Sequence, residues 1–436
     1  MDFLADVRLI DGPVFWAAWV CGAAAALYLV WRPGTWSARR WLLSVVSSIA
    51  AGLALVAAVH WALIDVFSTF PEDLPDDVLA WSVPAVSALV LMLLRLPGSS
   101  WRRRSAGAAA FLLVLLLSVL QINAYFGLNR TVSDLMGTAV ARIPALEPAL
   151  TRQSGAAAPA PLDGWTPQGE LPGEGALRKA AIPGEVSGMD TREAYIYLPP
   201  AYFAANRPAL PVLVLFSGQP GGPSDWLTGG ALRARLDDFA AGHRGLAPVV
   251  VVADPNGSQQ ANTLCMDSRI AQADTFLSSD VPRWISATLD IDPNHRQWAV
   301  GGFSFGATCA LQMGTRHPDI YSSVLAFSSE LEPALAKERQ KTIDASFPGN
   351  AAAFEVQTPL SMMNRSRFDS SGVYLAAGER DPEFIGYMNT LAEAARKSGF
   401  SVSSKPVEQA GHSWDTPSKG MADGLAFLAG RWGLNP

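Results

Sequence analysis

Four apolar segments near the start of the chain constrain its fold more than any other feature of its sequence. They cover residues 14–31, 41–64, 78–96 and 107–128. Each is long enough to cross the hydrocarbon core of a bilayer as an α-helix. The residues before the first segment are net acidic, which argues against a cleaved signal peptide with its basic leading region. The sequence therefore predicts a four-helix transmembrane region over residues 1–130.

The charges between these segments predict how they are oriented. The connections after the first and third segments are basic, and the loop after the second is acidic; the arginines are Arg32, Arg39, Arg40, Arg95, Arg102, Arg103 and Arg104. By the positive-inside rule, arginine-bearing connections face the cytoplasm. We therefore expect a multi-pass protein of the cell membrane, with the N-terminus and everything after residue 128 on the extracytoplasmic side.

Three polar residues stand near the predicted outer ends of the apolar segments: His60, Gln121 and Asn123. The ordinary interpretation is that they cap or cross-link helices. The alternative is a head-group site that gives a lipid substrate access to the rest of the protein. Gln121 and Asn123 are about 200° apart on one helix, so they cannot both face the same pocket.

The composition changes after the last apolar segment. Residues 131–150 mix polar and apolar side chains, and residues 151–175 are rich in Ala, Pro and Gly. The second composition is typical of linkers. We expect residues 131–175 to form a surface segment and linker, and residues 176–436 to form a globular domain.

Strand and helix signals alternate through that domain. We predict strands at residues 177–182, 192–198, 212–216, 249–253, 297–300, 323–327, 373–377 and 402–407, and helices near 232–241, 280–288, 305–316, 383–397 and 419–432. Strands separated by helices favour an α/β domain with a mostly parallel sheet and helices on both faces. The runs VLVLF and VVVVA are almost continuously aliphatic, as expected of strands buried on both faces.

A G-x-S-x-G pentapeptide, GFSFG, lies between the fifth predicted strand and the helix that follows it, with Ser304 at its centre. In a nucleophile elbow the serine stands at a sharp strand-to-helix turn, and the glycines let backbone and helix approach closely. This setting predicts an α/β-hydrolase fold in which Ser304 is the nucleophile.

An α/β-hydrolase supplies its acid and then its histidine after the nucleophile, each at the carboxyl end of a strand. Asp381 follows the seventh predicted strand, and His412 follows the eighth in a loop bounded by glycine. We predict that His412 is the base and that Asp381 orients it. Glu379, Glu330 and Glu332 also follow late strands and are alternatives for the acid.

The oxyanion hole of this fold takes one backbone N–H from the residue after the nucleophile and one from the loop of an earlier strand. The first is Phe305, and the candidate for the second is Gln219 in the loop SGQPGG. Pro220 has no N–H to donate. The alternative interpretation is that this glycine-rich loop is only a tight turn.

Three motifs together resemble the putative esterase family, which includes esterase D and the actinobacterial mycolyltransferases. They are GGFSFGATCALQMGTRHPDIY at residues 301–321, ADTFLSSDVPRWI at 273–285 and GHSW at 411–414, and the resemblance covers residues 192–436. It implies a nucleophile at Ser304, a base at His412 and backbone donors at Phe305 and Gln219. Trp414, in the last motif, is a further candidate for substrate access.

Mycolyltransferases usually carry an acidic residue before the oxyanion glycine, where this chain has Ser217. They are also usually secreted without a helical membrane anchor. Both departures favour ester hydrolysis over transfer to a trehalose-like acceptor.

The cysteines and the charge balance limit the remaining chemistry. Cys21 lies in the first apolar segment, whereas Cys265 and Cys309 lie beyond the membrane region, where an even pair suggests a disulfide. Two buried thiols are the alternative. No Cys/His cluster has zinc spacing and no phosphate-binding loop occurs, so we expect neither a metal nor a cofactor. A net charge of −6 without a long basic run argues against a nucleic-acid partner.

These observations predict a membrane-embedded serine esterase with an extracytoplasmic catalytic domain. The expected substrate is an ester of a lipid or cell-envelope component, such as an aminoacyl-phospholipid or an acylated envelope glycan. One alternative is an acyltransferase of the mycolyltransferase type, in which a sugar or lipid hydroxyl replaces water. Another is a non-catalytic membrane scaffold with a hydrolase fold, which the filled triad positions disfavour.

Overall fold

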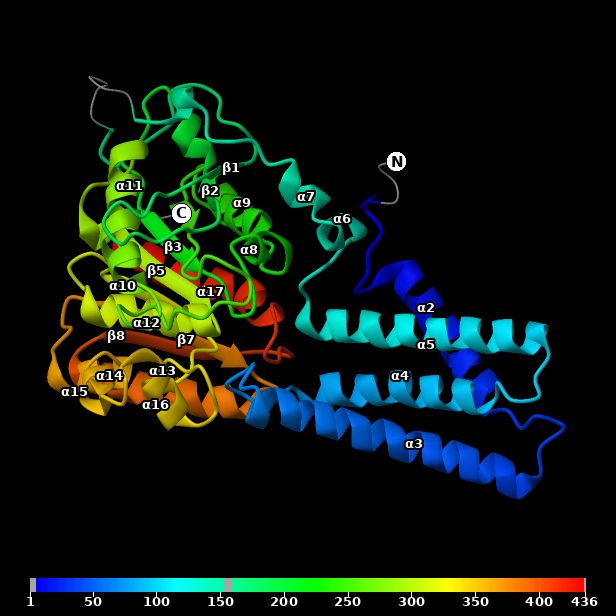
Figure 1. Cartoon of the computed structure of the whole chain (residues 1–436). Coiled ribbons are helices and arrows are strands. Elements are labelled where there is room, and N and C mark those ends of the chain that lie inside the picture. Colours follow the sequence, from blue (N-terminus) through cyan, green and yellow to red (C-terminus); the bar gives the residue numbers. More distant parts are fainter. Residues whose placement is uncertain (1–4, 153–158, 435–436) are drawn as a thin grey trace. The chain divides into compact units, whose positions relative to one another are not determined.

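The computed structural model describes residues 5–152 and 159–434. The chain forms two compact units (Figure 1). Unit 1 comprises Met1–Thr138 with Leu335–Glu338, and unit 2 comprises Ala139–Ala334 with Arg339–Pro436.

Unit 1 is a bundle of four long helices. They are α2 (Gly12–Val30), α3 (Ala38–Trp61) extended by the π-helical turn η1 (Ala62–Val66), α4 (Asp76–Leu94) and α5 (Trp101–Phe126). All four are long and apolar enough to cross a membrane, which confirms the four predicted helices. Helix α3 packs against α4, and α5 packs against both α2 and α4.

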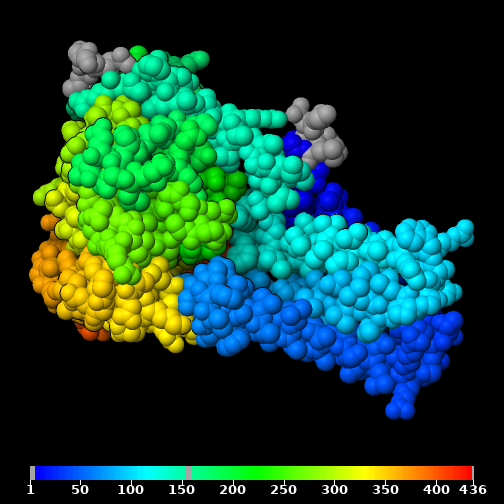
Figure 2. Space-filling view, in the orientation of Figure 1, coloured from blue at the N-terminus to red at the C-terminus, as the bar shows by residue number. Residues whose placement is uncertain are grey.

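Small side chains dominate the interior of the bundle. Its buried core consists of Ala25, Leu29, Ala88, Leu91, Ala110 and Val114. A Cβ added at Gly22 would lie 2.7 Å from a methyl carbon of Leu117, so glycine is needed where these two helices approach each other. Large side chains point outward, and Leu112 is 59% exposed. In the space-filling view of Figure 2, the atoms of unit 1, coloured blue to cyan, form a closely packed surface.

The segment expected to be a surface element and linker, residues 131–175, belongs to both units. The short helices α6 (Val132–Leu135) and α7 (Thr138–Ala141) and the turn η2 (Pro148–Leu150) follow the bundle. From residue 139 the chain is part of unit 2 and contacts the rest of that unit. Tyr202 Oη donates to Leu150 O at 2.7 Å, and the buried Trp165 donates through Nε1 to Asn206 O at 2.7 Å. Residues 153–158 of the expected linker lie outside the described residues.

Unit 2 is built on one sheet of eight strands. They are β1 (Ala176–Ala180), β2 (Ala194–Leu198), β3 (Val212–Phe216), β4 (Val249–Val252), β5 (Trp298–Phe303), β6 (Ser323–Phe327), β7 (Gly372–Gly378) and β8 (Ser401–Val407). Their order is β1-β2-β4-β3-β5-β6-β7-β8. The β1-β2 and β2-β4 pairs are antiparallel and the other five pairs are parallel, so β2 runs opposite to the remaining strands of this sheet. This is the predicted α/β-hydrolase sheet, and every predicted strand is present.

Helices cover both faces of this sheet (Figure 1). Those in unit 2 are α8 (Asp225–Thr228), α9 (Leu232–Gly242), α10 (Ala273–Thr275), η4 (Phe276–Asp280), α11 (Val281–Thr288), α12 (Phe305–Arg316), α13 (Arg339–Ser346), α14 (Ala351–Glu355), α15 (Pro359–Arg365), α16 (Pro382–Ser398) and α17 (Asp415–Trp432), with short turns η3 (Pro200–Phe203) and η5 (His295–Gln297). Helices α9 and α17 pack together, and α15 packs against α12 and α16. Every residue of β3 and β4 is buried, as their aliphatic sequences require.

Candidate active site

The backbone at Ser304 turns sharply between β5 and α12. Ser304 has a φ of 55 and a ψ of −124 degrees, a conformation that a non-glycine residue rarely adopts. A Cβ at Gly302 would lie 2.1 Å from Gly306 O, and one at Gly306 would lie 2.3 Å from Phe216 O. Both glycines of the pentapeptide are therefore required by close backbone contacts, and the strained serine is held at the carboxyl edge of the sheet.

Three side chains from three loops meet at this edge. His412 Nε2 lies 2.9 Å from Ser304 Oγ, and His412 Nδ1 lies 3.1 Å from Asp381 Oδ2. Ser304 follows β5, Asp381 follows β7, and His412 follows β8. Residues far apart in the sequence thus form a connected Ser-His-Asp arrangement, the order of contacts that nucleophilic catalysis by a serine uses.

Aromatic rings pack around the histidine. The ring of Phe384 lies 4.1 Å from that of His412 between centroids, and the ring of Phe303 lies 5.3 Å away. The Asp381 side chain also caps α16, accepting from Phe384 N at 3.4 Å. Both polar partners are largely shielded, with the side chain of Asp381 11% exposed and that of His412 18% exposed. Shielding strengthens the electrostatic coupling between them.

The alternative acids have other partners. Glu379 accepts from Gln409 N at 3.0 Å, and Glu332 pairs with Arg339 at 2.6 Å. Glu330 accepts a hydrogen bond at 3.2 Å from Thr308 Oγ1, which lies on α12, the elbow helix that follows Ser304. Among the acids considered from the sequence, Asp381 is the one whose hydrogen bond to His412 the structure records.

The loop after β3 passes directly beside the nucleophile. A Cβ at Gly218 would lie 3.6 Å from Ser304 Cβ, so the loop leaves little space at this point. In the described part of the chain, the backbone N–H groups of Gln219 and Phe305 have no hydrogen-bond acceptor. Two free donors beside a serine are what an oxyanion hole requires.

Comparison with known proteins identifies the family. The model of the family described as "Putative esterase" matches residues 189–427, more than half of the chain. The chain belongs to this family.

Curated relatives come from actinobacteria. An uncharacterized protein of Corynebacterium glutamicum is 36% identical over 270 residues, which cover 60% of this chain and 63% of that protein. The diacylglycerol acyltransferase/mycolyltransferase Ag85B of Mycobacterium leprae is 27% identical over 132 residues, covering 28% of this chain and 40% of that protein. The chain thus spans less than two thirds of the length of each relative.

Solved structures agree with the fold. A ferulic acid esterase matches with a TM-score of 0.50 at 16% identity, covering 59% of this chain and 99% of its own. An S-formylglutathione hydrolase from Agrobacterium tumefaciens matches with a TM-score of 0.50 at 17% identity, covering 61% of this chain and 98% of its own. Both likenesses concern the α/β-hydrolase fold.

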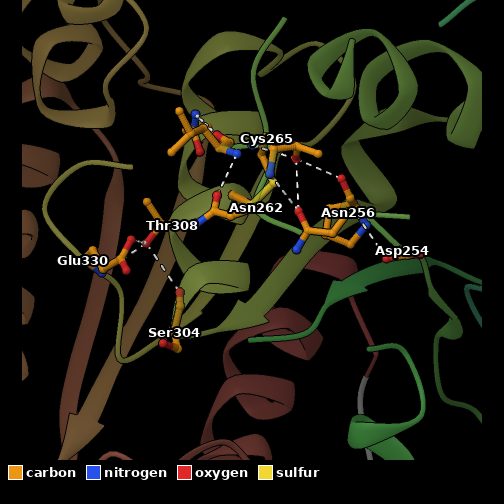
Figure 3. The surroundings of a disulfide bond; sticks show 12 residues. Asp254, Asn256, Asn262, Cys265, Ser304, Thr308 and Glu330 are labelled. Atoms are coloured by element: carbon orange, nitrogen blue, oxygen red, sulfur yellow. Dashed lines mark hydrogen bonds between the residues drawn. A yellow bond between two sulfur atoms is a disulfide. The ribbon is translucent and has the colours of Figure 1, made fainter. Parts of the chain in front are cut away.

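A partly buried ion pair, which could not be seen in the sequence, holds residues 217–222, the loop after β3. Arg192 donates to both carboxylate oxygens of Asp254 at 2.8 Å, and its Nη1 donates to Gly221 O at 3.0 Å. The hydrogen bonds to Asp254 raise the pKa of Arg192. Asp254, labelled in Figure 3, has a fully buried side chain that also accepts from Asn256 N at 3.1 Å. Arg192 therefore ties the loop after β3 to the end of β4.

Two further side chains brace the same loop. Ser217 Oγ donates to Gly222 O at 2.5 Å, and Asp225 Oδ2 accepts from Gly222 N at 2.9 Å. Burial raises the pKa of Asp225, and the hydrogen bond from Gly222 opposes that shift. Ser217 stands where mycolyltransferases usually have an acid, and here its hydroxyl is engaged within the loop.

The disulfide links the elbow helix to the loop after β4. Cys265 and Cys309 are bonded, with Cα atoms 5.5 Å apart. Figure 3 shows this bond near Ser304, near Thr308 on the elbow helix α12, and near Asn256 and Asn262 on the loop. Gln312, on the same helix, donates to Leu264 O at 3.0 Å. The elbow helix is thus fixed by a covalent bond as well as by hydrogen bonds.

The predicted access residues have different surroundings. In unit 1, His60 Nε2 lies 3.2 Å from Asp73 Oδ1, and Asn123 Nδ2 donates to Asn129 O at 2.7 Å. Gln121 Nε2 is buried without a hydrogen-bond partner among the described residues. In unit 2, the Trp414 ring lies 5.1 Å from that of Phe303. Their part in substrate access stays a prediction.

The other sequence expectations concern groups away from the triad. Cys21 is a free, exposed cysteine of α2. Within residues 5–152 and 159–434, no group of His, Cys, Asp or Glu side chains could hold a metal ion.

Proposed function

We propose that this protein is a membrane-anchored serine esterase that acts through Ser304, His412 and Asp381. One observation carries the proposal: the 2.9 Å contact between Ser304 Oγ and His412 Nε2, continued by the 3.1 Å contact between His412 Nδ1 and Asp381. This is the order of contacts that base-assisted attack by a serine needs.

In the proposed reaction His412 Nε2 takes the proton of Ser304 Oγ as the oxygen attacks the ester carbonyl. Asp381 holds the imidazole in the tautomer with the proton on Nδ1 and stabilises the imidazolium that forms. The proton then passes from His412 to the departing alcohol, leaving an acyl group on Ser304. Water, deprotonated by His412, attacks the acyl-enzyme and releases the acid.

The developing oxyanion is to be bound by the N–H groups of Gln219 and Phe305. Their lack of an acceptor among the described residues supports this role, since a donor already satisfied by the protein would have to be released first. The clamp of Arg192 on Gly221 O supports a preorganised loop, which needs no rearrangement during the reaction.

The membrane bundle supports a substrate in or on the bilayer. Four apolar helices precede the esterase unit, and one would suffice as a tether. We propose an ester of a lipid or cell-envelope component, with aminoacyl-phospholipids and acylated envelope glycans as the first candidates. The arginine-rich connections 31–41 and 95–104 support a cytoplasmic location for that end of the bundle, and hence an extracytoplasmic esterase unit.

An acyltransferase is the second candidate, because the Mycobacterium leprae relative is named a diacylglycerol acyltransferase/mycolyltransferase. In that case a sugar or lipid hydroxyl would take the place of water in the second step. Ser217 stands where mycolyltransferases usually have an acid, and its hydroxyl donates to Gly222 O. This difference favours hydrolysis over acyl transfer.

The deciding experiment uses the full-length protein in vesicles with an aminoacyl-phospholipid and with a soluble p-nitrophenyl ester. We expect release of free acid from both substrates and none above background from Ser304→Ala. Acyl transfer to an added hydroxyl acceptor in preference to free acid would instead establish the second candidate. Activity of Ser304→Ala equal to that of the wild type would reject both.

Protease added to intact spheroplasts tests the orientation: it should cleave the segment after residue 138.

A further inference from the structure

Unit 1 contains a cavity that the proposed esterase chemistry does not use. Its volume is about 260 Å³, and it is lined by residues of the connections 31–37 and 95–100 and by the helix ends beside them. Figure 1 shows these connections at one end of the bundle. The charged and aromatic residues of its wall are Tyr28, Trp31, Arg32, Trp36, Arg95, Arg103 and Arg104. No carboxylate lines the cavity, so four positive charges surround it without an acid.

Arg95 is the most firmly held of these side chains. It follows α4 directly, and its guanidinium donates across to α2, to Tyr28 O at 3.1 Å and to Trp31 O. Its Nε is buried without a hydrogen-bond partner among the described residues. The carbonyls fix the guanidinium in place and leave donors for an anion.

The other arginines add charge where the fold alone disfavours it. Arg103 and Arg104 lie in the first turn of α5, whose N-terminus carries the positive end of the helix dipole, so cations there are destabilising. In the part of the chain that the structure describes, neither pairs with a carboxylate. Ser100, the N-cap residue, makes no side-chain capping hydrogen bond. A bound anion would offset both the dipole and the mutual repulsion of the arginines.

The position of the cavity along the bundle indicates which anion it would meet. Beside the cavity, Trp31 is 78% exposed and Trp101 is 79% exposed. Such exposure is typical of aromatic residues at the head-group level of a bilayer. Met92 and Leu96 contribute apolar wall. We propose that this cavity binds the phosphate of an anionic glycerophospholipid head group, with the acyl chains along the apolar outside of the bundle.

The test measures binding to the full-length protein in an uncharged detergent, by the Tm change on adding phosphatidylglycerol, phosphatidylcholine or inorganic phosphate. Phosphatidylglycerol should raise the Tm in a saturable way, and phosphatidylcholine should not. Arg104→Gln should raise the phosphatidylglycerol concentration that gives half of the maximal Tm change about ten-fold, because a charge-assisted hydrogen bond to phosphate is lost. Arg102→Gln is the matched control: it removes the same charge from the same helix turn but lies outside the cavity wall.

Arg95→Gln should raise the phosphatidylglycerol concentration at half-saturation at least as much. If Arg95→Gln does not fold, Arg104→Gln still tests the proposal. Equal losses in Arg102→Gln and Arg104→Gln would overturn the proposal, because they would show general surface charge rather than a site. Equal responses to the two lipids would also overturn it. A comparable Tm change with millimolar inorganic phosphate would assign the cavity to the free ion and overturn the lipid assignment.

Discussion

In unit 1 many large apolar side chains point outward, whereas in unit 2 such side chains fill the interior. Leu112 of α5 is 59% exposed and the bundle core is rich in alanine. In unit 2 the largest side chains, such as Trp226 and Trp298, are fully buried against the sheet. Apolar side chains of similar type are therefore exposed on the outside of unit 1 and buried inside unit 2. This difference is expected if the outside of unit 1 faces lipid and that of unit 2 faces water.

The difference also separates what each unit contributes. In unit 2 a packed apolar sheet holds three residues that are far apart in the sequence within hydrogen-bonding distance at the carboxyl ends of its strands. The proposed reaction depends on these contacts. In unit 1, His60 and Asn123 lie near helix ends and contact residues of the adjoining loops. Substitutions of the same kind should consequently have different effects in the two units.

The largest effect is expected from the catalytic side of this comparison. His412→Ala should lower kcat by about a million-fold and Asp381→Asn by about ten thousand-fold, because the base and then its correct tautomer are lost. Hydrolysis of a soluble ester by the purified full-length variants measures both. His243→Ala is the control, since His243 stacks on Phe239 away from the triad. Losses in this control as large as those in His412→Ala would contradict the assignment.

The second prediction contrasts exposed apolar residues of the two units. Leu112→Lys, near the middle of α5, should disfavour membrane integration by about 3 kcal/mol. Val186 of unit 2 is 52% exposed. Val186→Lys should change stability by less than about 0.5 kcal/mol. The fraction of protein that resists carbonate extraction measures the first, and Tm in detergent measures the second. If both variants integrate like the wild type, the outward apolar face of unit 1 does not face lipid.

A smaller loss is expected when the oxyanion loop is released. Arg192→Met removes the donor to Gly221 O and leaves the buried Asp254 without its positively charged partner. We expect kcat to fall about 100-fold, as when one oxyanion donor is lost, with little change in KM for a soluble ester. Arg192→Lys should recover part of the rate. A change in KM alone would show that Arg192 acts on substrate binding rather than on the loop.

The smallest effect concerns the pH dependence of stability. Burial raises the pKa of Asp225. Its contribution to stability is therefore full below the unfolded pKa of about 3.9 and is lost as pH rises through the folded pKa. Asp225→Asn keeps an acceptor for Gly222 N but cannot ionise. The Tm of this variant minus that of the wild type should therefore increase between about pH 4 and pH 7. A difference that stays constant over this range would show that Asp225 does not titrate as stated.

Much of the fold could be predicted from the sequence, because its signals are local and strong. The four apolar segments and the eight strands follow from composition and periodicity alone. Helices α13, α14 and α15 were not predicted, since they are short and lack an extended apolar period. The start of α15 has a local signal in the sequence, a capping threonine followed by proline. The hydroxyl of Thr358 accepts from Ser361 N at 3.4 Å, and Pro359 is the first residue of the helix.

The candidate site was only partly visible in the sequence. Ser304 and His412 carry motif signals, and the order of strands and loops indicates Asp381. Nothing local indicates that Arg192 would meet Asp254, because their contact depends on the antiparallel pairing of β2 with β4. A buried acid at a strand end, as at Asp254, is the signal that could have suggested a partner.

The proposed esterase chemistry depends most on Ser304 being the nucleophile, and active-site labelling tests this directly. The full-length protein would be treated with a fluorophosphonate probe and the modified peptide identified by mass spectrometry. We expect one adduct, on Ser304, that is lost in Ser304→Ala and strongly reduced in His412→Ala. An adduct of equal yield on Ser304→Ala, or one on a serine outside the elbow, would contradict this assignment.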